Sequence, residues 1–294
     1  MGSGSYDTSR RSVRSAAMGY DSKPAREIFK QRSINNAMNP YGITVRESCD
    51  SEEHPESIAI VIGLDETGSM GMVPHSLVKE GLPHLMDTII QKGVPDPQVL
   101  FLGIGDHECD RAPLQVGQFE SSDELLDKWL TDVYLEGCGG GNAGESYHLA
   151  WYLAANHTKI DCFEKRKQKG FLFTIGDEPV LPDLPASAIK RLMGPGQYSD
   201  MSAVSLLNKA REKYNVFHVH IKETPSGGRQ DRVDKWHQLI QDNLLVVEHH
   251  EQVADVIAST IIKYTTTGVA ENQSSATVKV AAPVDPVKKD EMIL

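Results

Sequence analysis

Short apolar runs alternate with longer amphipathic runs through the middle of the chain. The runs 57–64, 98–105 and 170–176 are largely apolar and rich in Ile, Leu, Val and Phe. Continuous runs of this kind are typical of parallel strands covered on both faces. Between the first two, residues 73–91 carry apolar side chains at helical spacing, and an internal glycine and proline predict a kink or break. The pattern predicts an α/β fold with a doubly wound, mostly parallel, Rossmann-like sheet and helices on both faces.

The same alternation continues toward the C-terminus. The other expected elements are an edge strand at 115–119, a helix starting at 121–124, helices at about 145–157, 201–213, 232–241 and 252–264, and strands at 215–221 and 244–247. Residues 1–55 lack sustained periodicity, so we expect an N-terminal arm, extended or partly ordered, with a short helix at 24–29. The arm either packs on its own domain or binds a partner. We place the domain at 56–267 and a C-terminal tail at 268–294.

Composition narrows the class of protein. The chain has 294 residues, is 39% hydrophobic and carries a formal net charge of -11. This length and composition suit one sizeable core. The longest apolar runs are far shorter than the roughly 20 residues that span a bilayer, and the first residues do not resemble a secretory signal. The acidic charge opposes binding to nucleic acid. We therefore expect a cytoplasmic protein with reduced cysteines and without a membrane or nucleic-acid partner.

Oxygen-bearing side chains follow the first strand at alternating positions. They are Asp65, Thr67 and Ser69, separated by Glu66 and Gly68. A carboxylate with two hydroxyls suits Mg²⁺, a hard cation that keeps several of its waters. The segment therefore predicts a metal-binding loop at the end of a buried strand.

Two further carboxylates stand at equivalent places. Asp177 directly follows the strand at 170–176, and Glu145 follows a glycine-rich loop at 137–142. The carboxyl-end loops of a doubly wound sheet line one crevice, so residues distant in sequence converge there. We therefore predict one metal site, in which Thr67 and the other first-loop hydroxyl bind directly and the carboxylates hold metal-bound waters or bind as well.

These motifs resemble those of the von Willebrand factor A (VWA) domain. Asp65, Thr67 and Ser69 fill the D-x-S/T-x-S pattern of its metal-ion-dependent adhesion site (MIDAS), and Asp177 resembles the aspartate of its third loop. The resemblance covers about residues 57–265 and is closest to the stand-alone VWA proteins of bacteria and their phages.

The second loop departs from the usual pattern of that family. Many members carry a threonine where this chain has Gly141. The following segment instead resembles the variant of integrin β-subunit domains, in which a glutamate reaches the metal. That resemblance nominates Glu145, with Ser146 as the fallback.

The resemblance implies a protein that is not an enzyme but a metal-dependent protein-interaction module. Its Mg²⁺, or Mn²⁺ or Ca²⁺ in its place, takes an Asp or Glu carboxylate of a protein partner as the last ligand. For intracellular VWA proteins the implied partner is a MoxR-type AAA+ ATPase, to which they act as adaptors. The alternative is an assembly component of a bacterial or phage complex, tethered by the N-terminal arm. A metal-dependent phosphohydrolase is a third alternative.

Common enzyme motifs are incomplete. The nucleophile loop of haloacid-dehalogenase-type phosphatases needs a second carboxylate where Thr67 stands. A serine-hydrolase elbow needs glycine two residues before the nucleophile, and Thr67 occupies that position before Ser69. The sequence also lacks a G-x-x-x-x-G-K-[ST] phosphate loop.

The candidate residues also have plainer interpretations. Thr67 or Ser69 would in that case only cap a helix. Glu145 would be a carboxylate in the first turn of a helix, where the helix dipole favours negative charge. The polar segment 106–110 follows a strand too, but consecutive ligand-type residues are more often solvated. His218 and His220 alternate on a strand, where packing is the commoner role.

Overall fold

A six-stranded sheet organises the molecule. The computed structural model describes residues 4–68, 70–137 and 144–267. The strands are β2 (Ile58–Asp65), β3 (Pro97–Ile104), β4 (Leu114–Val116), β6 (Gly170–Gly176), β9 (Tyr214–Ile221) and β10 (Leu244–Val247). Their order is β10-β9-β6-β2-β3-β4, and every pairing is parallel except that of β4 with β3. This is the strand order of a Rossmann-like sheet, so the predicted fold class is confirmed.

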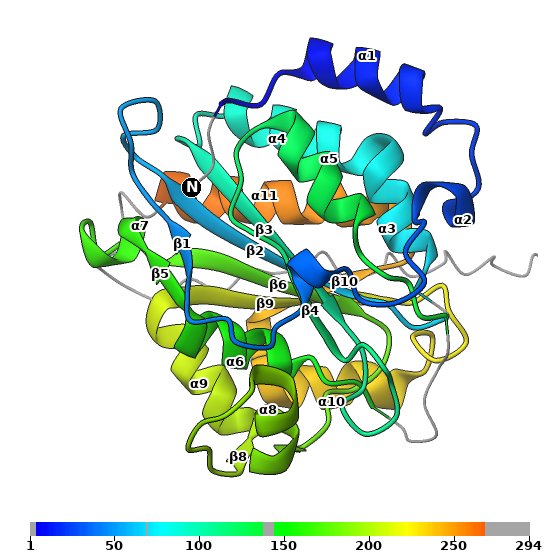
Figure 1. Ribbon diagram of the computed structural model, residues 1–294, viewed down its shortest axis with the longest axis vertical. Coiled ribbons are helices and arrows are strands. Elements are labelled where there is room, and N and C mark those ends of the chain that lie inside the picture. Colours follow the sequence, from blue (N-terminus) through cyan, green and yellow to red (C-terminus); the bar gives the residue numbers. More distant parts are fainter. Residues whose placement is uncertain (1–3, 69, 138–143, 268–294) are drawn as a thin grey trace, which may run out of the picture.

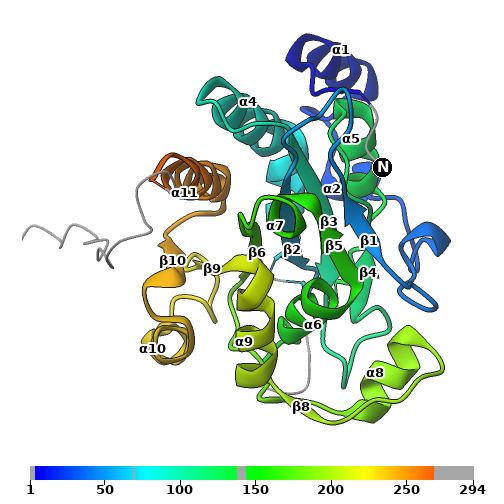
Figure 2. The same ribbon diagram turned by 90° about the vertical axis from the view of Figure 1, so that its left-hand side faces the viewer.

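Helices cover both faces of the sheet (Figure 1). One face carries α3 (Met72–Ser76), a π-helical turn η2 (Leu77–Gly81), α4 (Leu82–Gln91), α5 (Asp123–Thr131) and α11 (Val253–Thr267). The other carries α6 (His148–His157), α8 (Ala186–Met193), α9 (Ala203–Lys213) and α10 (Gln230–Ile240). Figure 2 shows the two layers from the side.

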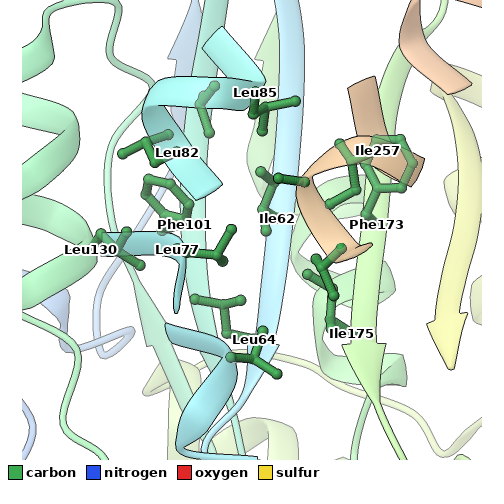
Figure 3. Close-up of a cluster of buried hydrophobic side chains, with 14 of the residues drawn as sticks. Ile62, Leu64, Leu77, Leu82, Leu85, Phe101, Leu130, Phe173, Ile175 and Ile257 are labelled. Carbon is green, nitrogen blue, oxygen red and sulfur yellow. The ribbon is translucent and has the colours of Figure 1, made fainter. Parts of the chain in front are cut away.

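Alternate residues of β2 enter the two apolar cores. Ile60, Ile62 and Leu64 face the α4 and α11 layer, whereas Ala59 and Val61 face α6 and α9. Figure 3 shows Ile62 and Leu64 among side chains of the neighbouring strands and helices. A strand buried on both faces explains why its sequence is apolar without interruption.

The break expected within 73–91 takes the form of a π-helical turn. Residues 77–81 join α3 to α4 with helical backbone throughout. Pro83 comes just after this turn, as the second residue of α4. The run therefore stays helical but is locally widened.

The N-terminal arm packs on its own domain. It contains α1 (Thr8–Met18), α2 (Ala25–Ile28), η1 (Asn36–Met38) and β1 (Arg46–Ser48), which pairs with β5 (Thr158–Ile160). The short helix expected at 24–29 is α2. Helix α1 lies against α5 and α4 (Figure 2). Of the two expectations for the arm, packing on its own domain is what the described residues 4–55 show, and binding of a partner stays untested.

The remaining elements are short. They are α7 (Asp161–Glu164), β7 (Asp183–Leu184), β8 (Met201–Ser202), η3 (Gln241–Asn243) and η4 (His250–Gln252). Within the described part of the chain, the helices are too short or too polar to cross a membrane. The tail expected at 268–294 lies outside the described residues.

Candidate metal centre

Asp65 ends β2 and is held by three hydrogen-bond donors. The backbone N–H and the hydroxyl of Thr67 donate to Asp65 Oδ1 over 2.9 and 2.6 Å, and Tyr147 Oη donates to Oδ2 over 2.6 Å. The aspartate is 1% exposed and Thr67 5%. Helix α3 begins only at Met72, and none of the described side chains caps it. Thr67 is therefore part of a buried loop turn and not a helix cap, while Ser69 lies outside the described residues.

Tyr147 reaches Asp65 because a glycine leaves room for it. A Cβ at position 176 would lie 1.8 Å from Tyr147 Oη. Burial, with Asp65, Asp177 and Glu145 nearby, raises the pKa of the Tyr147 hydroxyl well above its ordinary value, so it stays a donor. Tyr147 was not predicted from the sequence, because its flanking residues do not show which loop it contacts.

Asp177 follows β6 directly, as predicted. Its carboxylate is buried, and its Oδ2 accepts a hydrogen bond of 2.5 Å from the hydroxyl of Thr224, which follows β9. Its other oxygen, Oδ1, is buried, and none of the described residues forms a hydrogen bond with it. Thr224 was not predicted, because its role depends on how the loop after β9 folds back over the sheet edge.

Glu145 belongs to an extended segment beside the third loop. Its N–H donates to Pro179 O over 2.8 Å, and its carbonyl accepts from Leu181 N over 2.9 Å. The residue is 3% exposed, and within the part of the chain that the structure describes its Oε2 has no hydrogen-bond partner. Helix α6 starts three residues later, at His148. The helix expected from 145 therefore starts late, because Glu145 pairs with the third loop instead.

Electrostatics join the three carboxylates into one site. Burial raises the pKa of Asp65 to about 7. The hydrogen bonds from Thr67 and Tyr147 lower this pKa, and the charge of Asp177 raises it further. Burial also raises the pKa of Glu145 to about 10, with further contributions from Asp65, two aspartates of the loop after β3, and Asp177. The charge of Asp177 thus raises the pKa of both Asp65 and Glu145, and the charge of Asp65 raises the pKa of Glu145.

The three carboxylates are not tightly clustered. Among described residues, a single set of three His, Cys, Asp or Glu side chains has ligand atoms all within 4.8 Å of one another, namely Glu223, His250 and Glu251. That set lies at the ends of β9 and β10, where His250 Nδ1 is 2.6 Å from Glu223 Oε1. The wider spacing of Asp65, Glu145 and Asp177 suits a cation that keeps waters between itself and the carboxylates.

Glu66, beside the candidate ligands, is buried as well. It is 2% exposed, and Gln115 Nε2 donates to its carboxylate. Gln115 also exchanges two 2.9 Å hydrogen bonds with the backbone of Tyr134, and Gly137 N donates to Glu66 O over 3.4 Å. Glu66 therefore ties the metal loop to the start of the glycine-rich loop. A Cβ at Gly103 would meet its carboxylate at 1.2 Å, so glycine is required there.

The remaining sequence candidates have structural roles. Ser146, the fallback ligand, has its hydroxyl 2.9 Å from His107 N and 2.7 Å from His107 Nδ1. His218 stacks on Trp236 with ring centroids 3.5 Å apart. His220 Nε2 lies 2.9 Å from a backbone carbonyl. The interpretation of both histidines as packing residues agrees with their complete burial.

The segment 106–110 forms a closed turn. Asp106 N donates to Asp110 Oδ2 over 2.6 Å, and Glu108 N donates to Asp106 Oδ1 over 2.8 Å. These carboxylates cap their own loop, so the segment is a turn at the rim of the site.

Comparisons with known proteins find likeness only among solved structures. No family model matches the chain, and no curated protein matches it. The pilus adhesin SpaC of Lactobacillus rhamnosus GG, in its open conformation, is 12% identical with a TM-score of 0.47, over 71% of this chain and 30% of that one. A von Willebrand factor type A structure from Catenulispora acidiphila is 12% identical with a TM-score of 0.40, over 78% of this chain and 51% of that one. The chain thus spans about a third to half of these proteins. Likeness at this level carries no argument about ligands or partners.

Proposed function

We propose that the chain is a metal-dependent protein-interaction module. In this proposal Asp65, Thr67, Ser69, Glu145 and Asp177 hold Mg²⁺. The observation that carries it is the burial of three carboxylates from three loops at the carboxyl edge of the sheet, with Glu145 Oε2 and Asp177 Oδ1 lacking a hydrogen-bond partner among the described residues.

The donor set fits a hard divalent cation. In the described part of the chain, Asp65, Glu145 and Asp177 form no ion pair with Lys, Arg or His. Burying negative groups beside one another is costly unless a cation or hydrogen bonds compensate. Carboxylate and hydroxyl oxygens are the ligands of Mg²⁺, Mn²⁺ and Ca²⁺. A bound cation would supply an electrophilic centre with a position open to an incoming carboxylate.

The chain's own residues would orient that cation. Tyr147 and Thr67 fix the Asp65 carboxylate from two sides, and Thr224 fixes one oxygen of Asp177. The partner would then contribute an Asp or Glu side chain as the last ligand. By resemblance, we propose a MoxR-type AAA+ ATPase as the class of partner and the cytoplasm as the compartment.

Calorimetric titration of Mg²⁺ into the full chain tests the proposal. We expect saturable binding that is lost in Asp65→Ala. Asp242→Ala is the control and should retain binding, since Asp242 is exposed and distant in sequence from the predicted ligands. Circular dichroism should show that both variants are folded. Equal binding by Asp65→Ala and wild type, or no binding by a folded wild type, would contradict the proposed site.

The alternative of an arm-tethered assembly component has less support. Arg11 in α1 is 2% exposed and lies 3.0 Å from Asp127 of α5, so this helix is part of the domain surface. Tethering through α1 would require it to detach. A metal-dependent phosphohydrolase predicts turnover of p-nitrophenyl phosphate that disappears in Asp65→Ala, and we expect none in the wild type.

A further inference from the structure

A cleft with cationic walls lies where the N-terminal arm crosses the domain. It has a volume of about 370 Å³ and is lined by Ala25, Arg26, Phe29, Lys30, Gln31, Arg32 and Leu135. We call it the basic cleft. Three of its lining residues are cationic and none is acidic, whereas the adjoining pocket, which shares Lys30 and Gln31, is also lined by Glu27 and Asp132. Arg26, Lys30 and Arg32 are all exposed, and no ion pair involves them within the described residues.

The cationic side chains of the basic cleft differ from the arginines of α1, which form ion pairs with the domain. Arg11 and Arg14 of α1 each pair with Asp127, and Arg14 also pairs with Asp123. Those charges are neutralised by the domain on which the arm packs. The cationic groups of the cleft have no such partner, although the whole chain has a formal net charge of -11. A concentrated positive region on an acidic protein attracts an acidic ligand to that place.

The basic cleft is connected to the loop of the candidate metal centre through neighbouring segments. Its wall residue Leu135 stands two positions before Gly137, whose N–H donates to Glu66 O in the metal loop. Helix α2 lies against α3, the helix that follows the metal loop (Figure 1). His75 of α3 also has Nε2 3.0 Å from Lys23 O in the arm. These contacts place the arm beside the helix that follows the metal loop.

We propose that the basic cleft binds an acidic segment of the protein partner whose carboxylate reaches the metal. The link to the metal rests on the proposed function, whereas recognition by the cleft stands on its own charges. Guanidinium groups bind carboxylates through paired N–H donors, so clustered Asp and Glu residues suit Arg26 and Arg32. Nucleic acid fits less well, because the overall charge is negative and the aromatic ring in the lining, Phe29, is buried rather than presented for stacking.

The test uses the full chain and a fluorescein-labelled peptide of twelve residues in which Glu and Gly alternate. A peptide with Gln in place of Glu is the uncharged control. Anisotropy is measured at low salt in Mg²⁺ and in EDTA. The test variant carries Arg26→Glu, Lys30→Glu and Arg32→Glu. Its matched control carries Lys92→Glu, Lys190→Glu and Lys235→Glu, three exposed positions outside the cleft with the same change in charge.

We expect the test variant to bind the acidic peptide about tenfold more weakly than wild type, because three exposed ion pairs are each worth a few-fold in affinity. The control variant should lose much less, and Mg²⁺ binding should be unchanged in both. If the test variant binds the acidic peptide more weakly while wild type binds it equally in Mg²⁺ and in EDTA, the cleft is supported and its link to the metal is contradicted. If EDTA weakens binding of the acidic peptide but the three substitutions of the test variant do not, the cleft proposal is contradicted and the metal proposal stands. Equal loss in both variants, absence of peptide binding, or tighter binding of a uridine 12-mer would overturn the cleft.

Discussion

Tyr147 is the residue through which the second loop meets the first. Its hydroxyl donates to Asp65 Oδ2, and its ring lies 5.0 Å from the His218 ring and 5.5 Å from the Trp236 ring. Those two rings are stacked on each other and fully buried. The hydroxyl is therefore held at the carboxylate by a rigid aromatic group. Groups that hydrogen-bond to metal ligands orient them and tune their affinity.

Tyr147→Phe removes the donor and keeps the ring. We expect Mg²⁺ affinity to fall by about tenfold, the lower end of what loss of a partner to a ligand costs. Tyr152→Phe is the matched control, since Tyr152 is also on this helical segment and its hydroxyl instead lies 3.3 Å from His157 Nε2. Calorimetry compares the two, and equal affinities would show that Tyr147 does not position Asp65.

His148 makes stability depend on pH. Burial lowers its pKa to about 4, although its Nε2 lies 3.1 Å from Asp183 O. In the unfolded chain the imidazole titrates near 6.5, so between these values the unfolded state binds more protons. Folding stability contributed by the neutral imidazole is thus full above pH of about 6.5 and decreases as pH falls toward about 4. Burial lowers the pKa of His107, His157, His218 and His220 in the same direction.

His148→Gln should reduce that dependence. When the pH falls from 7 to 5, we expect the free energy of unfolding to decrease by about 2 kcal/mol less in the variant than in wild type. Urea unfolding at the two pH values measures the difference, and His237→Gln, on an exposed helical position, is the control. Identical pH dependence in His148→Gln and wild type would contradict a buried neutral His148.

Prediction from sequence succeeded for residues whose place depends on one element. Asp65 and Asp177 follow apolar strands directly, so the strand pattern alone placed them at the carboxyl edge. Tyr147, Thr224 and Glu66 were missed, because each acts by meeting a side chain from another loop. Such meetings depend on tertiary packing, and the local pattern around these residues carries no sign of them.

At the scale of elements, α1 is fixed to the domain through buried charge. Arg11 is 2% exposed, with Nε 3.1 Å from Asp127 Oδ1, and its guanidinium also donates to Val78 O. Asp127 binds Arg14 Nε through its other oxygen over 3.1 Å. The sequence showed this segment as basic and without apolar periodicity. Packing of the arm was one of two expectations, but helix α1 itself was not predicted, because it docks through ion pairs with α5 rather than through an apolar stripe.

Asp127→Ala should destabilise the fold strongly. It leaves the buried Arg11 without its ion-pair partner, and removal of one partner from a buried pair costs roughly 3–5 kcal/mol. Glu47→Ala breaks an exposed pair with Lys159 and should cost less than about 1 kcal/mol. Urea unfolding compares both with wild type. A small effect of Asp127→Ala would show that α1 is only loosely attached and would favour the arm-tethered alternative.

At the scale of the molecule, sheet order brings the candidate ligands together. β2 and β6 are neighbours at the centre of the sheet, so the loops that begin with Asp65 and Asp177 start side by side. Glu145 arrives by pairing with the segment after Asp177. The alternating apolar pattern was sufficient to predict this architecture. It did not predict α8 or the small β7 and β8 pair, whose sequences are short and of mixed character.

The most direct test of the metal centre is an anomalous diffraction map of crystals grown with Mn²⁺, an ion the same oxygen ligands accept. We predict one strong peak bounded by Asp65, Thr67, Ser69, Glu145 and Asp177, absent from crystals of Asp65→Ala. A fully occupied peak elsewhere, for example at Glu223, His250 and Glu251, with none at the predicted place would contradict the account.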